Sequence, residues 1–354
     1  MASTVSRDSD AKSARSASRP SAADIGRLGC VTGVQILGTG SYVPEQIVDN
    51  ADLAEHGYDA DWIVQRTGIK QRRRAAKDEA TSDLAYQAAL RCLDQAGADA
   101  NDIDLVLVAT LTPDSPMPST ACLLQNRLAK SSAPAMDMNA ACAGFMYALI
   151  TGMQFVRSGC SKRVLVVGAD IMSRVVDPAD EKTFPLFGDG AGAVLLGAGD
   201  DQQGAVSFTL GADGEGAKLL HIPGGGSRTP ICSSEVASQR FIQMDGRAVF
   251  KWAVRMLSDS VRSVMEHAKL TAEDLDLVVF HQANIRIIDS ALNDLGIDRD
   301  KVILNLDRYG NTSAASMPLA LDEAFREGRI KPGNRVLLCG FGAGLAWGAG
   351  ILQW

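Results

Sequence analysis

Cys142 is the residue whose surroundings best suit a reactive thiol. It lies in MDMNAACAGFMYALITGMQFV, where alanine and glycine flank the thiol and an apolar helical pattern continues to Val156. The pattern predicts a cysteine on a tight turn at the start of a buried helix, where free N–H groups and partial positive charge lower a thiol pKa. Small neighbours let a substrate reach the sulfur. The alternative is a packed core thiol, since unpaired cysteines are often buried.

His281 and Asn311 are the two polar residues that best fit as partners. Histidine occurs four times, and only His281 directly follows a predicted buried strand, Leu277–Phe280. Ligands bind at the carboxyl ends of strands in open α/β sheets, so this imidazole is a catalytic candidate, although a lone histidine is usually structural. Asn311 stands in the turn RYGNTSAASMP. Its amide either serves the turn or donates a hydrogen bond to a carbonyl oxygen.

Two glycine-rich segments are predicted to bring backbone close to other groups. GFGAGLAWG at 340–348 lacks the lysine and Ser/Thr of a phosphate-binding loop, so it is weak evidence for a nucleotide site. Glycines there allow backbone N–H groups to approach a ligand, which suits an oxyanion hole. FGDGAGAVLLG at 187–197 is better interpreted as a tight turn between strands.

These residues must be positioned by alternating strands and helices. Short apolar runs predict buried strands at 103–110, 163–170, 192–199, 277–280 and 335–344, and helical spacing predicts helices at 82–96 and 248–267. Such alternation predicts βαβ units and a mostly parallel sheet. IDLVLVAT is echoed by LDLVVFHQ, and RVLVVGAD by RVLLCGFG, which favours two similar halves about a pseudo-twofold axis. We place these halves at 31–205 and 206–354.

Composition narrows the class of protein. A formal net charge of -7 argues against general nucleic-acid binding, and no uncharged apolar window is long enough to predict a membrane span. The seven cysteines form no CxxC pair, so neither a zinc site nor a redox dithiol is indicated, and a reducing cytoplasm is expected. Residues 1–30 are rich in Ser, Ala and Arg, which predicts a disordered extension. A transit peptide is the alternative, weakened by three aspartates.

Several motifs in order resemble the β-ketoacyl-[acyl-carrier-protein] synthase III family. They span the chain from about Val34 to Trp354 and are DWIVQRTGI (61–69), AACAGF (140–145), FGDGAGA (187–193), HQANIRI (281–287), GNTSAAS (310–316) and GFGAG (340–344). The resemblance implies a thiolase-like α/β fold, with two βαβ-rich halves in an α-β-α-β-α arrangement. It also implies a homodimer that uses acyl-coenzyme A as a substrate and needs no cofactor.

The resemblance assigns roles to the central residues. Cys142 would take an acyl group from acyl-coenzyme A, with acetyl as the first expectation. His281 and Asn311 would bind the malonyl thioester of an acyl carrier protein and assist its decarboxylation, so that one enzyme carries out several half-reactions of fatty-acid synthesis. The N–H groups of Cys142 and Ala343 would form the oxyanion hole. Ala343 replaces a glycine common in the family, which leaves the donor intact if φ stays negative.

The resemblance also implies residues that bind the larger substrates. Adenine stacking and phosphate contact are implied for one tryptophan and two arginines, a pantetheine contact for one asparagine, and steering of an acidic carrier protein for three further residues. A loop methionine would shape the partner subunit's acyl pocket. The tryptophan is Trp62, the arginines are Arg66 and Arg174, and the asparagine is Asn284. The three residues that steer the carrier protein are Gln282, Arg286 and Lys251, and the methionine is Met117.

Other functions are weighed against this one. A related condensing enzyme of polyketide, quinolone or hydroxymethylglutaryl type would share the fold, but elongating synthases carry a second histidine where this chain has Asn311. A non-catalytic acyl-binding or carrier-protein-binding module would not need the intact set of Cys142, His281 and Asn311. A dehydrogenase is disfavoured because no GxGxxG follows the first strand.

Overall fold

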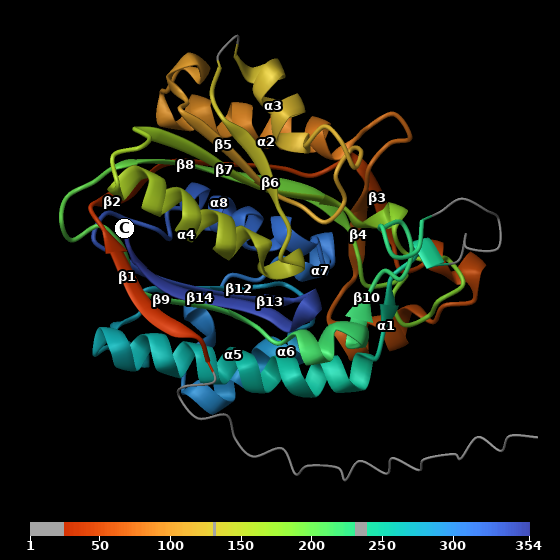
Figure 1. Cartoon of the computed structure of the whole chain (residues 1–354). Coiled ribbons are helices and arrows are strands. Elements are labelled where there is room, and N and C mark those ends of the chain that lie inside the picture. The colour runs from red at the N-terminus through yellow and green to blue at the C-terminus, as the bar shows by residue number, and fades with distance from the viewer. Residues whose placement is uncertain (1–24, 130–131, 231–238) are drawn as a thin grey trace, which may run out of the picture.

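Five layers, in the order helix, sheet, helix, sheet, helix, make up the protein (Figure 1). The computed structural model describes residues 25–129, 132–230 and 239–354. The predicted layered α/β fold is therefore confirmed. Within the described ranges, no helix combines the length and apolarity needed to cross a membrane.

The first sheet is built by the N-terminal half. Its strands are β2 (Val34–Tyr42), β5 (Leu105–Ala109), β6 (Ala135–Met138), β7 (Arg163–Ile171) and β8 (Asp189–Ala198). They lie in the order β2-β8-β7-β5-β6. β5 pairs in parallel with β6 and β7, whereas β8 pairs antiparallel with both β7 and β2.

The second sheet repeats this topology. Its strands are β1 (Arg27–Thr32), β9 (Gly204–Ala212), β12 (Leu277–Phe280), β13 (Arg335–Gly342) and β14 (Ala346–Gln353). The order is β1-β9-β14-β13-β12. β12 and β13 are parallel, and β14 is antiparallel to β13 and β9, so β9, β14, β13 and β12 correspond to β2, β8, β7 and β5. The repeated pattern is what an internal duplication would produce.

The prediction of mostly parallel sheets is wrong, because both sheets are mixed. β13 and β14 are joined by only Ala343–Leu345, and so short a connection permits only antiparallel pairing. Their sequence, two apolar strands separated by glycines, does not distinguish this hairpin from one half of a βαβ unit. Two further two-stranded sheets are formed by β3 (Gln46–Asp49) with β4 (Gln71–Arg74), and by β10 (Leu220–His221) with β11 (Gln243–Met244).

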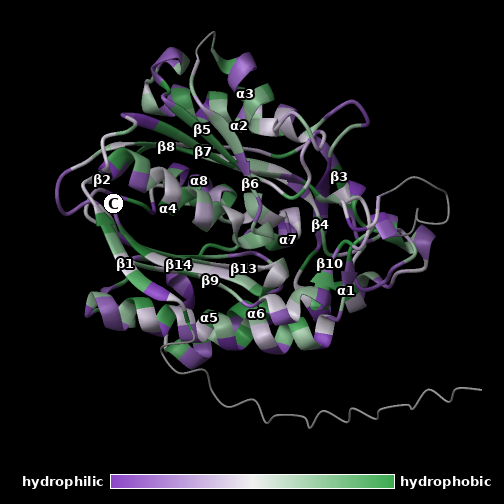
Figure 2. Cartoon of the chain, viewed as in Figure 1, coloured by the Kyte–Doolittle hydropathy of each residue, from purple (hydrophilic) through white to green (hydrophobic). Residues whose placement is uncertain are grey.

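Helices cover both sheets and fill the space between them (Figure 1). α2 (Thr81–Ala96) and α3 (Thr120–Leu128) lie outside the first sheet, α5 (Gly246–Ala268) and α6 (Ile285–Leu295) lie outside the second, and α4 (Gly144–Arg157) and α8 (Ser316–Arg326) lie between them. The smaller helices are α1 (Ala60–Thr67) and α7 (Leu306–Tyr309). Apolar colour runs through the central strands and inner helices, and polar colour marks the outer helix faces (Figure 2).

The described part of the first 30 residues, from Ile25 onward, belongs to the second sheet. Ile25 is buried, and its carbonyl oxygen accepts hydrogen bonds from Trp347 Nε1 at 2.8 Å and Thr209 Oγ1 at 3.0 Å. β1 then pairs antiparallel with β9. The predicted boundary at residue 31 is therefore too late. Residues 1–24 of the predicted extension lie outside the described residues.

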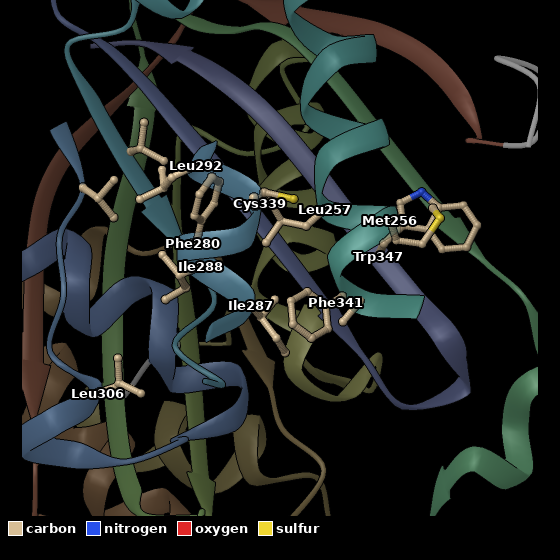
Figure 3. Close-up of a cluster of buried hydrophobic side chains, with 14 of the residues drawn as sticks. Met256, Leu257, Phe280, Ile287, Ile288, Leu292, Leu306, Cys339, Phe341 and Trp347 are labelled. Carbon is tan, nitrogen blue, oxygen red and sulfur yellow. The ribbon is translucent and has the colours of Figure 1, made fainter. Parts of the chain in front are cut away.

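A large apolar cluster fixes the second sheet against α5 and α6 (Figure 3). α5 begins where Asp245 accepts a hydrogen bond from Ala248 N at 3.0 Å, and α6 begins where Asn284 accepts one from Arg286 N at 2.9 Å. Such caps satisfy otherwise unpaired N–H groups. The cluster includes Phe280 and Cys339, which directly precede and neighbour His281, so the core holds the end of β12 rigidly.

Candidate active site

Cys142 lies on a strained turn that leads into α4. Asn139 Oδ1 accepts a hydrogen bond from Ala141 N at 3.1 Å, and Ala141 adopts a positive φ of 47°. A short 3-10 turn, Ala141–Ala143, connects directly to α4. Positive φ in a residue with a Cβ is unfavourable and recurs at functional sites. The turn places the Cys142 side chain, 6% exposed, between the two sheets.

Asn311 starts an equivalent turn ahead of α8. Its Oδ1 accepts a hydrogen bond from Ser313 N at 2.9 Å, and Ser313 has a positive φ of 52°. The 3-10 turn Ser313–Ala315 then leads into α8. Because Oδ1 is engaged, the Asn311 Nδ2 group is the part of the amide left to donate elsewhere. The buried Asn311 side chain is thus a fixed hydrogen-bond donor.

His281 is held by its backbone, by Ser316 and by an aromatic ring. Its N–H donates to Cys339 O at 2.8 Å, and its Nδ1 lies 2.9 Å from Ser316 Oγ. The same Ser316 Oγ accepts a hydrogen bond from Gln282 N at 2.7 Å. The Phe341 ring lies edge-on, with ring centroids 5.3 Å apart. Burial lowers the pKa of His281 to about 3, so the imidazole is neutral.

The Ser316 contact assigns a tautomer to that neutral imidazole. Ser316 is buried, and in the described residues its hydroxyl has no recorded partner other than Gln282 N and His281. Donation of the Ser316 O–H to Nδ1 satisfies both groups, whereas the opposite tautomer leaves a buried hydroxyl proton unpaired. The imidazole proton is therefore assigned to Nε2, which makes Nε2 a donor.

The three predicted catalytic side chains line one narrow cavity. Cys142, His281 and Asn311 share a space of about 110 Å³ with the aromatic residues Phe250 and Trp252. A second cavity, of about 530 Å³, is also lined by Cys142. The other lining residues of that second cavity are mostly apolar and include Leu111, Pro113, Pro116, Met172, Ile222 and Ile242. Cys142 therefore borders both cavities.

The prediction of a lowered thiol pKa is wrong for this structure. Burial raises the pKa of Cys142 to about 12, and the hydrogen bond to Ser313 Oγ at 3.4 Å opposes only part of that effect. Removing a thiolate from water costs more than one nearby hydroxyl restores. The resting site thus holds a neutral thiol beside a neutral imidazole, and the thiol proton has to leave during the reaction.

The end of β13 lies directly against the backbone of Cys142. A Cβ added to Gly342 would stand 2.7 Å from Cys142 N, so only glycine leaves that amide accessible. Ala343 avoids positive φ, whereas Gly344 and Leu345 adopt it. The requirement that the φ of Ala343 not be positive, so that its N–H can act as a donor, is therefore met. Its pairing with the Cys142 N–H in an oxyanion hole stays a prediction.

Three of the four residues predicted to bind coenzyme A lie together. Trp62 is 44% exposed on α1, and the Arg66 guanidinium carbon lies 5.6 Å from the centroid of its ring. Asn284, which lines the narrow cavity, donates from Nδ2 to Arg66 O at 3.1 Å. Arg174 makes a different set of contacts: its Nη2 donates to carbonyl oxygens of the 76–79 loop. Its predicted phosphate contact has no structural support and stays a prediction.

The residues predicted to bind a carrier protein divide into two kinds. Lys251 and Arg286 are exposed near the narrow cavity, and the Arg286 guanidinium lies 5.5 Å from the ring centroid of Phe250. Gln282 is fully buried, with its amide bonded to Phe280 O, Ile303 O and Asn305 N. The predicted role of Gln282 as a carrier-protein contact is therefore wrong.

Met117 does not line either cavity of its own chain. It is 86% exposed, while Pro113 and Pro116 of the same loop border the larger cavity. An exposed side chain is compatible with the predicted contact to a second subunit, and that contact stays a prediction.

Three polar residues of the site were missed by sequence reasoning. Ser316 orients His281, Ser313 contacts the Cys142 sulfur, and Asp170 is fully buried against the Ser313 turn, where it accepts a hydrogen bond from Ala314 N at 3.1 Å. The two serines lie in the quoted motif GNTSAAS but resemble ordinary small turn residues. Asp170 lies near the end of β7, 144 positions from Ala314, and no local sequence signal connects the two residues.

The layered fold, with a buried cysteine, imidazole and carboxamide in one cavity, defines a thiolase-fold condensing enzyme. Family models described as 3-oxoacyl-[acyl-carrier-protein] synthase III and its C-terminal part match residues 136–214 and 265–354. The chain is 58% identical over 346 residues to a β-ketoacyl-[acyl-carrier-protein] synthase III of Rhodopirellula baltica, covering 92% of this chain and 100% of that protein. The chain belongs to the β-ketoacyl-[acyl-carrier-protein] synthase III family.

Solved structures agree with that membership. The synthase III of Thermus thermophilus superposes with a TM-score of 0.85 at 46% identity, covering 90% of this chain and 99% of that one. The priming β-ketosynthase of the R1128 polyketide pathway superposes equally well, at 0.85, but at 37% identity, covering 92% and 97% of the two chains. Both resemblances span nearly the whole folded chain.

Proposed function

We propose that this protein condenses an acyl-coenzyme A primer, acetyl-coenzyme A foremost, with malonyl-acyl carrier protein. The products are a 3-ketoacyl-acyl carrier protein, CO2 and coenzyme A, and the reaction starts fatty-acid synthesis. The observation that carries the proposal is the cavity in which Cys142, His281 and Asn311 meet. Membership of the synthase III family supports the same conclusion.

The first half-reaction transfers the acyl group to Cys142. The sulfur attacks the thioester carbonyl, and charge develops on its oxygen. The Cys142 N–H, left accessible by Gly342, and the Ala343 N–H donate to that oxygen. Collapse of the intermediate releases coenzyme A as its thiol, which balances the proton lost by Cys142, and leaves an acyl-enzyme. The larger cavity beyond the thiol takes the acyl chain.

The second half-reaction is assigned to His281 and Asn311. Loss of CO2 from the malonyl group leaves enolate charge on the thioester oxygen. The His281 Nε2–H and the Asn311 Nδ2–H are neutral donors that stabilise this charge without first protonating it. The carbanion then attacks the acyl-Cys142 carbonyl. A site free of full positive charge suits this step, since a buried imidazolium would be costly.

The substrates approach from the side of α1 and α6. The Trp62 and Arg66 pair offers stacking and positive charge to the nucleotide end of coenzyme A, and Asn284 connects it to the cavity. Lys251 and Arg286 provide positive charge for an acidic carrier protein. We assign the enzyme to the cytoplasm as a homodimer in which Met117 reaches the partner's cavity, since Met117 is exposed and β6 is an edge strand.

A second candidate is primer formation for a polyketide. The larger cavity, about 530 Å³, has room for primers longer than acetyl, and a polyketide priming synthase shares the fold at 37% identity. A panel of acyl-coenzyme A primers with product mass spectrometry separates the two. Preference for acetyl supports the fatty-acid function, and preference for a longer or unusual primer supports the alternative.

The proposal is tested by intact mass after incubation with acetyl-coenzyme A. Cys142→Ser is expected to abolish acylation. Cys339→Ser is the matched control, because burial raises the pKa of Cys339 equally, to about 12, but its thiol lines neither cavity. Acylation of Cys142→Ser at the wild-type rate would overturn the assignment, as would equal loss in both variants with the folds intact.

A further inference from the structure

A hydrogen-bond ladder beside β12 passes from backbone to side chain where the strand ends. Val278 of β12 forms a parallel bridge with Val302, and Ile303 N donates to Val278 O at 3.1 Å. The bonds of a parallel ladder are evenly spaced and recur every second residue on each chain. The next rung would therefore join the backbone of Phe280 to Ile303 O and Asn305 N. Both of these groups bind a side chain instead.

Gln282 supplies that side chain. Its Nε2 donates to Ile303 O at 3.1 Å, and its Oε1 accepts from Asn305 N at 3.2 Å, which are the two bonds that a strand residue would make there. The same Nε2 also donates to Phe280 O at 2.8 Å, so both of its protons are used. The fully buried Gln282 amide is thus inserted between the end of β12 and the segment after Ile303, where it acts as a peptide unit.

The two chain segments that Gln282 joins carry the two proposed enolate donors. His281 directly follows Phe280 at the end of β12. On the other segment, α7 begins directly after Asn305, and Asn311 lies two residues after α7 ends. Two donors to one enolate oxygen have to converge on a single point, and a misplacement of about 1 Å costs about 100-fold in rate. The separation that the Gln282 amide maintains therefore bears directly on decarboxylation.

The backbone of Gln282 makes a second connection to the same segment. Its N–H donates to Ser316 Oγ at 2.7 Å, and this hydroxyl also lies 2.9 Å from His281 Nδ1. Ser316 is the first residue of α8, which follows the Asn311 turn. Gln282 thus holds the segment that carries Asn311 on both sides, at Asn305 through its side chain and at Ser316 through its backbone.

The groups proposed for acylation are held by other contacts. Within the described ranges, none of the hydrogen bonds recorded for the Gln282 side chain or N–H goes to Cys142 or to the backbone of residues 342–343. The Cys142 turn is fixed by its own asparagine, Asn139. Gln282 lines neither of the two cavities that Cys142 borders, so it does not touch a substrate held there.

We propose that Gln282 is a positioning residue that sets the separation of His281 and Asn311 for decarboxylation. The inference rests on the proposed function and adds the group that aligns its two enolate donors. Without the Gln282 amide, Ile303 O and Asn305 N are left unpaired in the core, and the two segments have to shift to satisfy them. The enolate oxygen then reaches one donor at the expense of the other, while acylation of the thiol proceeds as before.

Gln282→Met tests the proposal, because methionine is equally long and unbranched but makes none of the three amide bonds. In CO2 release from malonyl-acyl carrier protein, kcat should fall about 100-fold with KM unchanged, since alignment is lost and binding is not. Single-turnover acylation by acetyl-coenzyme A should stay near the wild-type rate. Gln282→Glu is the second variant, for use where Gln282→Met does not fold. Its carboxyl donates to at most one of the two carbonyl oxygens, so the same selective loss, of about tenfold, is expected.

Asn305→Ala is the matched control. It removes a buried hydrogen bond from the same segment, that from Asn305 Nδ2 to Glu323 Oε2 at 2.9 Å, but keeps the backbone N–H that Gln282 accepts. Both half-reactions should keep their wild-type rates. Equal loss of both half-reactions in Gln282→Met would overturn the proposal, as would a raised KM with unchanged kcat or an equally selective loss in Asn305→Ala. Absence of CO2 release from the wild type would instead overturn the proposed function.

Discussion

The turn that carries Cys142 and the turn that carries Asn311 have the same backbone design. Each starts with an asparagine whose Oδ1 accepts the N–H two residues later, at 3.1 Å from Ala141 and 2.9 Å from Ser313. Each then has a positive φ, a 3-10 turn and a buried helix. By this register Cys142 in one half corresponds to Ala314 in the other, as expected if the two halves share an origin.

The two turns differ in what lies against that corresponding residue. Strands β7 and β13 align as RVLVVGAD and RVLLCGFG, so Asp170 corresponds to Gly342. The Asp170 carboxylate accepts the N–H of Ala314, whereas Gly342 has no side chain and leaves the N–H of Cys142 accessible. In the Asn311 turn the N–H of Ala314 is occupied by the Asp170 carboxylate. In the Cys142 turn the N–H of Cys142 stays free for the oxyanion of a substrate. The oxyanion site therefore depends on residue 342 having no side chain.

Filling the open turn should have the largest effect. Gly342→Ala places a Cβ 2.7 Å from Cys142 N, so the backbone of the Cys142 turn has to shift and the donor is displaced, although the φ of −160° is itself allowed for alanine. We expect acylation to fall about 100- to 1,000-fold, as when one oxyanion donor is removed. Single-turnover intact-mass kinetics measures this. Gly350→Ala, whose nearest contact is the flexible end of Met146 at 3.3 Å, is the control and should acylate normally.

Changing the donor of the second turn should affect the other half-reaction. Asn311→Asp keeps an oxygen for Ser313 N but replaces the Nδ2 donor by a carboxylate oxygen that repels the enolate. Decarboxylation of malonyl-acyl carrier protein, followed by CO2 release, should fall about 100-fold. Acylation of Cys142 should stay near the wild-type rate. Equal loss of both steps would show that the two turns do not divide the chemistry.

A smaller loss is expected when the orientation of His281 is relaxed. Ser316→Ala removes the hydroxyl that holds Nδ1, so the imidazole can adopt either tautomer. Decarboxylation should fall about tenfold while acylation changes little. Ser260→Ala is a suitable control, because Ser260 is buried but its hydroxyl has no hydrogen-bond partner in the described residues. An equal fall in the decarboxylation rate of Ser260→Ala would contradict the orienting role of Ser316.

The last expected effect is on stability in acid and leaves catalysis at neutral pH unchanged. The pKa of His281 is lowered from 6.5 to about 3 by burial, so the unfolded chain binds a proton more readily than the folded protein. The free energy of unfolding should therefore decrease as pH falls from 6.5 towards 3, by about 1.4 kcal/mol per pH unit from this residue. Urea unfolding at several pH values measures it. His281→Asn should lack this component, and an unchanged slope would contradict the burial argument.

Sequence reasoning located elements whose signals are local. The strand at 103–110 and the helix at 82–96 are close to β5 and α2 because apolar periodicity follows directly from burial. β1 was missed because Arg27, Gly29 and Cys30 show no alternation, and its pairing with β9 connects residues about 180 positions apart. The mixed sheets were missed because strand direction depends on connection geometry and not on composition.

The site residues could likewise be predicted only where the sequence signal is local. Cys142, His281 and Asn311 stand in motifs that can be quoted from the sequence, and the structure brings them together. Gln282 was misassigned because its neighbour His281 faces the cavity while its own amide is bonded into the core. Asp170 and Ala314 lie 144 residues apart in the sequence, and only the packing of the two halves brings them into hydrogen-bond contact. The raised pKa of Cys142 likewise depends on burial by distant residues.

A crystal structure of the enzyme acylated by acetyl-coenzyme A tests the contrast between the open and closed turns most directly. The account predicts the acyl group on Cys142, with its carbonyl oxygen accepting hydrogen bonds from the N–H groups of Cys142 and Ala343, while Asp170 still holds Ala314 N. An acyl group on another residue, or a carbonyl oxygen directed away from the Cys142 N–H, would contradict it.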